Sequence, residues 1–238
     1  MGDLHAPYVD RAAFSVACQI IEAVKPGAVV FNGDCLDCYQ VSRYSQDPKR
    51  KTEFQKDLDS CRDCLEQVRR ATYDSVSWLY YVEGNHERRL TDWKWKNPEA
   101  SSLNALTVPA LLGFEELGIR WVPEKERLLF SDWLVTHGTV CRQKSGYTAQ
   151  AMIDRFGCSG VSNHVHRLAQ VNRSIWKQTR TWIENGCLCS LDMEYLDLCD
   201  WQHGFTVLSR ETAGEVWPEL VTIKNGKARY CGVTYTAC

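Results

Sequence analysis

The chain has 238 residues, of which 44% are hydrophobic and 24% are charged, and its formal net charge is -2. This composition is typical of a globular protein and suffices for one large domain or two small ones. Because the net charge is small, no global field attracts nucleic acid or a membrane surface. No run approaches the roughly 18 apolar residues that span a membrane. Twelve cysteines without a signal-peptide pattern predict reduced thiols and a cytoplasmic protein.

Helices and short strands alternate along the first two thirds of the chain. Apolar residues at helical spacing predict helices over residues 10–24, 52–70, 87–95, 108–117 and 147–156. Short apolar runs predict buried strands over residues 28–31, 78–82 and 133–136. Beyond residue 168 strand-like segments dominate, over residues 174–183, 204–208 and 215–223, and Asn225-Gly226 then predicts a hairpin. The sequence therefore predicts one α/β domain over residues 1–238, with more antiparallel strands in its second half.

Five short polar clusters carry the chemistry of the sequence. They are Asp3-x-His5, Gly33-Asp34-x-x-Asp37, Gly84-Asn85-His86-Glu87, His137-Gly138 and Asn163-His164-x-His166. Three of them directly follow a short apolar run, and ligands of open α/β sheets bind at the carboxyl ends of strands. One such cluster alone is a weak signal, since Asn and Asp often cap helices. Together they offer imidazoles and carboxylates, which bind Mn, Fe, Zn or Ni, and a shared carboxylate would suit a two-metal, phosphoester-hydrolysing centre.

On these motifs the chain resembles a calcineurin-like metallophosphoesterase. The D-x-H, G-D-x-x-D, G-N-H-[DE], H and G-H-x-H motifs of that family match in order between Asp3 and His166. Residues 33–44, 84–87, 184–189 and 201–205 resemble phage and prophage members in particular. The resemblance implies an α/β sandwich of two mixed β-sheets flanked by helices, in the cytoplasm of a bacterial or phage-infected cell.

The resemblance also implies roles for the motif residues. One divalent metal ion would be held by Asp3, His5 and His166, the other by Asn85, His137 and His164, and Asp34 would bridge both. His86 would protonate the leaving oxygen, and Asp37 would accept its other N–H and fix its tautomer. Glu87 is better explained as a helix cap or ion-pair partner. Mn is the first metal expected, with Fe, Zn or Ni as alternatives, because mixed oxygen and nitrogen ligands are not selective.

The implied reaction is attack of a metal-bound hydroxide on phosphorus. In the phosphoprotein phosphatases of the family an Arg follows G-D-x-x-D, whereas this chain has Cys38. A dianionic monoester needs more positive charge than a diester, so we expect a phosphodiesterase on nucleotide or nucleic-acid-type diesters. A phosphomonoesterase or phosphoprotein phosphatase is the alternative, because Arg43, Arg88 or Arg142 would be able to bind the substrate in place of the missing Arg.

Two further departures from the family pattern concern the metal motifs. Asn163 stands where the family has Gly, although Asn also tolerates the positive φ of a tight turn. The family's first strand, which delivers D-x-H, has no counterpart before Met1. We expect either that the gene starts further upstream or that the fold manages without this strand.

Two other classes of protein compete with the enzyme hypothesis. Cys35-x-x-Cys38 and Cys61-x-x-Cys64 formally match a four-thiolate zinc site, which would make residues 35–64 a small nucleic-acid-binding module. Buried thiols that pack as small apolar groups are favoured, because the second pair falls within a predicted helix. The run Trp93-Lys94-Trp95-Lys96 resembles single-strand binders, but it fits better as part of a substrate groove.

Overall fold

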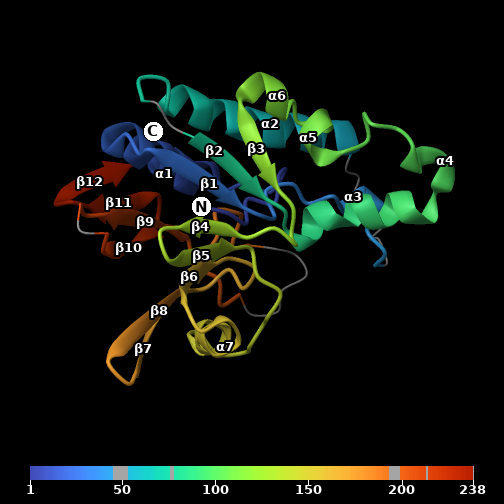
Figure 1. The fold of residues 1–238 in the computed structure, drawn as a ribbon. Coiled ribbons are helices and arrows are strands. Elements are labelled where there is room, and N and C mark those ends of the chain that lie inside the picture. Colours follow the sequence, from blue (N-terminus) through green and yellow to red (C-terminus); the bar gives the residue numbers. More distant parts are fainter. Residues whose placement is uncertain (45–52, 76–77, 193–198, 213, 238) are drawn as a thin grey trace.

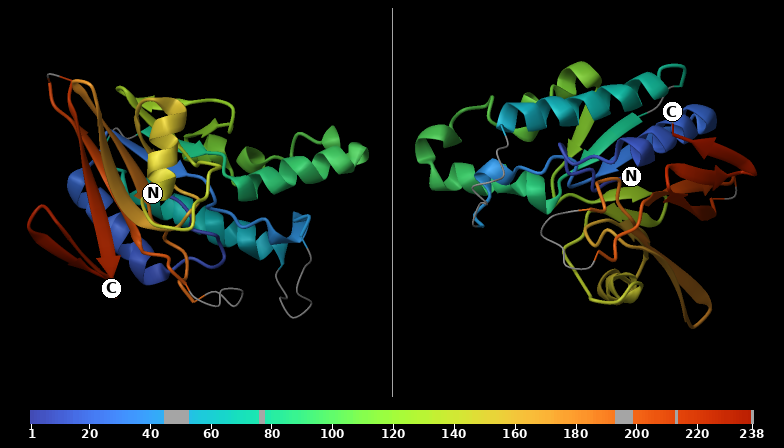
Figure 2. Two further views of the ribbon diagram at one scale, coloured as in Figure 1. Left: turned by 90° about the horizontal axis from the view of Figure 1, so that it is seen from below. Right: turned by 180° about the vertical axis from the view of Figure 1, so that it is seen from behind.

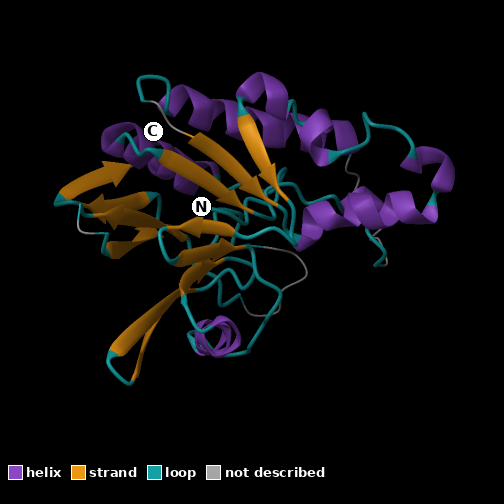
Figure 3. Cartoon of the chain, viewed as in Figure 1, coloured by secondary structure: helices purple, strands orange, loops and turns teal. Residues whose placement is uncertain are grey.

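The computed structural model describes residues 1–44, 53–75, 78–192, 199–212 and 214–237. Sheets lie in the middle of the molecule, with helices α1, α2, α5 and α6 on one side and α7 on the other (Figures 1 and 3). The predicted α/β fold with sheets flanked by helices is thereby confirmed, although the described strands form three sheets, of which one is mixed, where two mixed sheets were expected. Among the described residues, no helix is both long enough and apolar enough to cross a membrane.

The strands of the described residues form three hydrogen-bonded sheets. The first is parallel, in the order β1 (Ala28–Asn32), β2 (Trp78–Val82) and β3 (Ile119–Val122). The second is mixed, in the order β4 (Leu128–Phe130), β5 (Trp133–Thr136), β6 (Ser159–Ser162), β8 (Gln178–Asn185) and β7 (Leu168–Ile175). The third is antiparallel, in the order β12 (Val233–Thr236), β11 (Lys227–Tyr230), β10 (Val216–Lys224) and β9 (Gly204–Arg210).

The helices follow from capping and amphipathic spacing. They are α1 (Arg11–Val24), α2 (Phe54–Ala71), α3 (Asn85–Lys96), α4 (Pro98–Ser101), α5 (Val108–Leu111), α6 (Phe114–Leu117) and α7 (Tyr147–Phe156), with a short 3-10 helix, η1, at Tyr39–Val41. The Asp10 side chain caps α1 by accepting the Ala13 N–H at 2.8 Å. Helices α3 and α4 extend away from the sheets on one side, and the β7–β8 hairpin extends on another (Figures 1 and 2).

Two predicted elements differ from the observed ones. The single helix predicted over residues 108–117 is two short helices, because Gly113 adopts φ 66° between them. The strand predicted over residues 174–183 is wrong: the chain turns at Trp176, with φ 56°, between β7 and β8. Strands β3, β4, β6 and β12, and most of β7, were not predicted. The predicted helix over residues 147–156 is confirmed at both ends.

The four cysteines of the proposed zinc module lie in the main hydrophobic core. Cys35, Cys38, Cys61 and Cys64 are all fully buried between the first sheet and helices α1 and α2. Burial raises the pKa of each of these thiols, so they stay protonated at neutral pH. They therefore pack as small apolar side chains, and the metal-compatible groups found among the described residues are built from His and Asp.

Candidate metal centre

The five polar clusters meet at the carboxyl ends of strands from two sheets. Strand β1 ends at Asn32, directly before the Gly33 cluster, and β2 ends at Val82, one residue before the Gly84 cluster. In the second sheet, β5 leads into His137 and β6 into Asn163. Parallel strands bring their carboxyl ends to one edge of a sheet, which is why segments far apart in the sequence converge here.

The N-terminal segment reaches the same place by pairing with the loop after β1. The backbone N–H of Asp3 donates to Gly33 O at 3.0 Å, and the N–H of His5 donates to Asp34 O at 2.9 Å. The Asn32 N–H donates to Met1 O at 2.7 Å, so the segment runs beside the end of β1. These backbone hydrogen bonds between the N-terminal segment and residues 32–34 fix the positions of Asp3 and His5.

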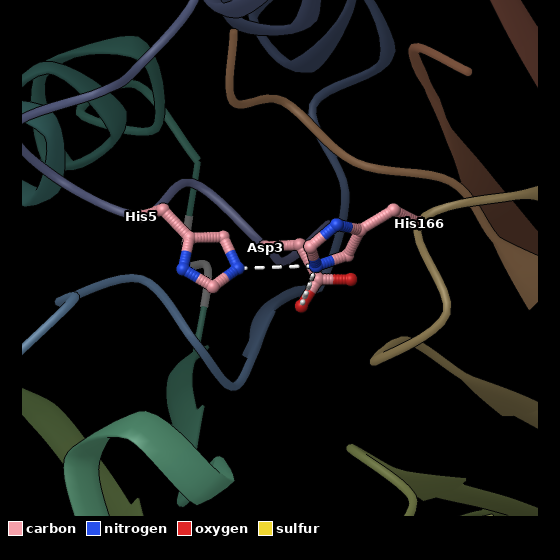
Figure 4. Close-up of side chains that lie close together, drawn as sticks. All are labelled: Asp3, His5 and His166. Carbon is pink, nitrogen blue, oxygen red and sulfur yellow. Dashed lines mark hydrogen bonds and ion pairs between the residues drawn. The ribbon is translucent and has the colours of Figure 1, made fainter. Parts of the chain in front are cut away.

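Three side chains, called here the first group, converge at this end: Asp3, His5 and His166 (Figure 4). Nε2 of His5 lies 3.1 Å from Nε2 of His166, which in turn lies 3.6 Å from Asp3 Oδ1. All three residues are buried, and Asp3 Oδ1 and His166 Nδ1 have no hydrogen-bond partner among the described residues. Buried polar atoms are normally paired, so the unpaired Asp3 Oδ1, which faces His166 Nε2, fits a cation.

The second group consists of Asp34, His137 and His164. Nε2 of His137 lies 3.1 Å from Asp34 Oδ2 and 3.1 Å from Asn85 Oδ1. The Asn85 oxygen also lies 2.7 Å from His164 Nδ1. Asp34 Oδ2 is 3.9 Å from His5 Nε2, so one carboxylate oxygen faces both groups.

His86 stands at the border of the two groups. Its Nδ1 lies 2.8 Å from Asp37 Oδ1, and its Nε2 lies 3.8 Å from Asp34 Oδ2. His86 also belongs to a metal-compatible set with His5 and Asp34, so proximity alone does not separate it from the other histidines. Arg89, which the sequence reasoning did not single out, places its Nη2 atom 2.9 Å from His86 Nε2.

The backbone of the centre is tightly constrained. Five of the seven predicted metal ligands have positive φ, an uncommon conformation for residues other than Gly: Asp3 (50°), His5 (47°), Asp34 (50°), His164 (77°) and His166 (59°). A Cβ at Gly33, whose φ is 82°, would lie 2.5 Å from His137, and one at Gly84 would lie 2.2 Å from Asp34 Oδ1. Strained backbone of this kind persists where surrounding contacts hold it, and it concentrates at functional sites.

Glu87 stabilises this constrained backbone through several hydrogen bonds. Its buried carboxylate accepts the backbone N–H groups of residues 34, 35, 36 and 84 at 2.8–3.0 Å and the Tyr81 hydroxyl at 2.6 Å. It therefore fixes the loop that carries Asp34 to the start of α3. The sequence suggested that Glu87 caps a helix or forms an ion pair. It does bond to the helix start at residue 84, but most of its partners are backbone amides of the loop at residues 34–36.

Asn163 orients Asp3 through a buried amide network. Its Nδ2 donates to Asp3 Oδ2 at 3.2 Å, and the His164 N–H donates to the same oxygen at 2.9 Å. Its remaining partners are Gly186 O, Asn32 Nδ2 and Asn185 Nδ2. The positive φ expected at Asn163 falls on His164 instead. A Cβ at Gly2 would lie 2.8 Å from Asn163 Cγ, so a glycine there makes room for this amide.

The pKa values of the histidines in the centre are shifted in different directions. Burial lowers the pKa of His5, and the nearby charge of His86 lowers it further. Burial also lowers the pKa of His164, to about 4. Burial alone would lower the pKa of His137, but the charge and hydrogen bond of Asp34 outweigh it and raise this pKa to about 10. One protonated imidazole and one neutral imidazole therefore flank Asn85 at neutral pH.

Comparison with known proteins identifies the fold of the chain. No protein-family model matches the chain. The gene 54 proteins of Mycobacterium phages L5 and D29 are both 28% identical to it, over 242 and 243 residues that cover 95% of the chain and 93% of each relative. A double mutant of Vps29 from Entamoeba histolytica matches 96% of the chain and 93% of its own length, with a TM-score of 0.50 and 12% identity. The chain has the calcineurin-like metallophosphoesterase fold.

Within this metallophosphoesterase fold, the predicted metal ligands and His86 with Asp37 come together, whereas the three predicted arginines do not join them. Arg43 is exposed and donates to the Tyr44 hydroxyl at 3.3 Å. Arg88 donates to Glu124 Oε2 at 2.6 Å. Arg142 is exposed, and its backbone carbonyl accepts a hydrogen bond from Arg167. Substrate binding by these arginines stays a prediction.

Proposed function

We propose that the protein is a binuclear metal-dependent phosphohydrolase. The observation that carries this proposal is the position of Asp34 Oδ2, which lies 3.1 Å from His137 Nε2 and 3.9 Å from His5 Nε2. A carboxylate oxygen between two sets of imidazoles is the kind of ligand that two cations share in hydrolytic sites. The metallophosphoesterase fold supports the same class of reaction by analogy.

Seven side chains would hold the two ions. The first ion would be held by Asp3, His5 and His166, the second by Asn85, His137 and His164, and Asp34 would contact both. Mn is the proposed metal, with Fe, Zn or Ni as alternatives, because the oxygen and nitrogen ligands are not selective. When bound, two such cations lower the pKa of a coordinated water and so supply a nucleophile near neutral pH.

His86 is the proposed general acid. The bond from its Nδ1 to Asp37 fixes the ring and leaves Nε2 toward the centre. Although burial alone would lower the pKa of His86, the charges of Asp34 and Asp37 raise it above its usual value. A proton is therefore available on His86 near neutral pH for transfer to the leaving oxygen.

Phosphodiesters of the nucleotide or nucleic-acid type are the proposed substrates. Cys38, at the position of the phosphatase arginine, is fully buried and offers no charge for a dianionic monoester. Phosphate monoesters, including phosphoproteins, are the second candidate, because the Arg89 guanidinium lies beside His86. The mycobacteriophage relatives support the cytoplasm of a bacterial or phage-infected cell as the proposed location.

The test compares bis-p-nitrophenyl phosphate with p-nitrophenyl phosphate on one Mn-loaded preparation. After correction for uncatalysed reactivity, we expect a higher kcat/KM for the diester, and we expect chelation with EDTA to abolish both activities. A clear preference for the monoester would replace the diesterase by the second candidate. Hydrolysis that survives chelation would contradict the metal-dependent mechanism itself.

A further inference from the structure

Two neighbouring arginines at the start of α3 have different surroundings. Arg88 donates to Glu124 Oε2 at 2.6 Å and to Asp92 Oδ1 at 3.4 Å, so two carboxylates compensate its charge. Arg89 points to the candidate metal centre, where its Nη2 lies 2.9 Å from His86 Nε2. Helical spacing explains the difference, because His86 and Arg89 are three residues apart and share a face of the helix.

The charge of Arg89 is less directly compensated than that of Arg88. Its Nη1 donates to the backbone carbonyl of Asp37 at 2.9 Å, while the carboxylate oxygen of Asp37 is 3.8 Å away, beyond hydrogen-bond distance. The Arg89 side chain is only 18% exposed. The Arg89 guanidinium is therefore largely shielded from water, between the Asp37 carbonyl and the His86 ring. Its planar set of N–H donors suits phosphoryl oxygens.

We propose that Arg89 binds a non-bridging phosphoryl oxygen of the substrate. This inference rests on the proposed phosphohydrolase function and assigns to that site the cationic residue that Cys38 does not provide. Without substrate, the Nη2 donor of Arg89 is directed at Nε2 of His86. With the Nε2 proton that the general-acid role requires, His86 offers Arg89 no acceptor, so a charged phosphoryl oxygen supplies one while His86 Nε2 faces the leaving oxygen.

Arg89 thereby sets the balance between the two candidate substrate classes. A monoester carries about two negative charges at neutral pH and a diester one, so the Coulomb attraction to a fixed guanidinium is larger for the monoester. Loss of the Arg89 charge should therefore raise KM for p-nitrophenyl phosphate more than KM for bis-p-nitrophenyl phosphate. An arginine that only supported the fold would change both substrates equally.

The experiment measures the binding of inorganic phosphate to Mn-loaded protein by calorimetry. Arg89→Ala should raise the Kd of phosphate roughly 10- to 100-fold, the usual range for a charged hydrogen bond. Arg89→Gln removes the charge but keeps a polar side chain, shorter than that of arginine, so it should show a similar loss. Arg120→Ala, at an exposed arginine paired with Glu126, is the control for loss of one positive charge and should change Kd by less than about threefold.

Each outcome decides the matter. Weaker phosphate binding in both Arg89 variants, with Arg120→Ala near wild type, supports the inference. Unchanged phosphate binding in Arg89→Gln overturns it, even where Arg89→Ala does not fold, and an equal loss in Arg120→Ala overturns it as well. Wild-type protein that binds phosphate through Arg89 but hydrolyses no ester would contradict the proposed function and leave the anion site standing.

Discussion

The first and second groups of the candidate metal centre are built from the same residue types but are balanced differently. In the first group, Asp3 Oδ1 has no hydrogen-bond partner among the described residues, and burial lowers the pKa of His5. In the second group, the Asp34 carboxylate pairs with His137 and raises its pKa to about 10. The first group thus offers a carboxylate oxygen without a hydrogen bond, 3.6 Å from His166 Nε2, whereas the second contains a closer ion pair of 3.1 Å.

This difference indicates how a centre proposed to bind two ions stays folded when no ion is bound. Clustered carboxylates repel one another, and Asp3 and Asp34 both lie in the centre. A protonated His137 between them offsets this repulsion, since its Nδ1 lies 3.9 Å from Asp3 Oδ1. We infer that the second group stabilises the metal-free fold, while the first group is shaped for a cation alone.

Asp34→Ala should have the largest effect, because Asp34 faces both groups. We expect the variant to bind neither ion and to lose roughly 10³-fold or more in kcat/KM. His166→Ala should empty the first group only and leave one ion in the second. Metal content per chain, measured by mass spectrometry after gel filtration, separates the two variants. An Asp34→Ala protein that retains two ions would contradict the role of Asp34 as a ligand shared by both groups.

His86→Ala tests the border between the groups. The variant should keep both ions and lose roughly 10²–10⁴-fold in turnover of a diester with a poor leaving group. The loss should shrink with p-nitrophenolate, which leaves without a proton. Turnover of both substrates and metal content are measured on the same preparation. Because His86 lies within a metal-compatible set with His5 and Asp34, a variant without metal would reassign His86 as a ligand.

Asn163→Gly, which restores the residue that the family has, should weaken the first group selectively. Without the bond to Asp3 Oδ2 this carboxylate is less well oriented, and loss of such a supporting bond usually reduces metal affinity 10- to 100-fold. Calorimetric titration with Mn should show one weakened and one unchanged binding step. Asn185→Ala is the control, because it removes a partner of Asn163 but leaves the bond to Asp3. Equal weakening of both steps would contradict selective orientation.

The smallest expected effect is the release of a proton on metal binding, which should occur at the second group. His137 is protonated below its pKa of about 10, so an ion must displace that proton, and affinity at the second group should rise about tenfold per pH unit up to pH 10. Because this pKa is raised on folding, the pair with Asp34 stabilises the metal-free protein at neutral pH and is lost as the pH rises through 10. Calorimetry at pH 7 in buffers of different ionisation enthalpy counts the protons. Binding of two ions without proton release would contradict the charge assigned to His137.

The sequence predicted three of the four strands that lead into the site, missing β6, and a smaller share of those that complete the sheets. Strands β1, β2 and β5 are uninterrupted apolar runs, and a local pattern suffices to identify them. Strand β3 carries Arg120 and depends on pairing with β2, a contact between residues about 40 positions apart. The turn at Trp176 lacks the Gly, Asn or Pro that would have indicated it.

The site shows the same limit. Its metal-compatible residues are recognisable because each cluster combines His, Asp or Asn at a strand end. Arg89 lies beside His86 only because both residues are within helix α3. Their spacing of three residues was the one sequence feature that could have indicated this contact. The role of Asn163 could not be read locally, since its partners lie 22 to 160 residues away.

The most direct test is anomalous diffraction from crystals soaked in Mn. The account predicts two anomalous peaks per chain, one contacted by Asp3, His5 and His166 and the other by Asn85, His137 and His164, with Asp34 contacting both. A single peak, or a peak contacted by His86 in place of Asp34, would contradict the two-ion centre.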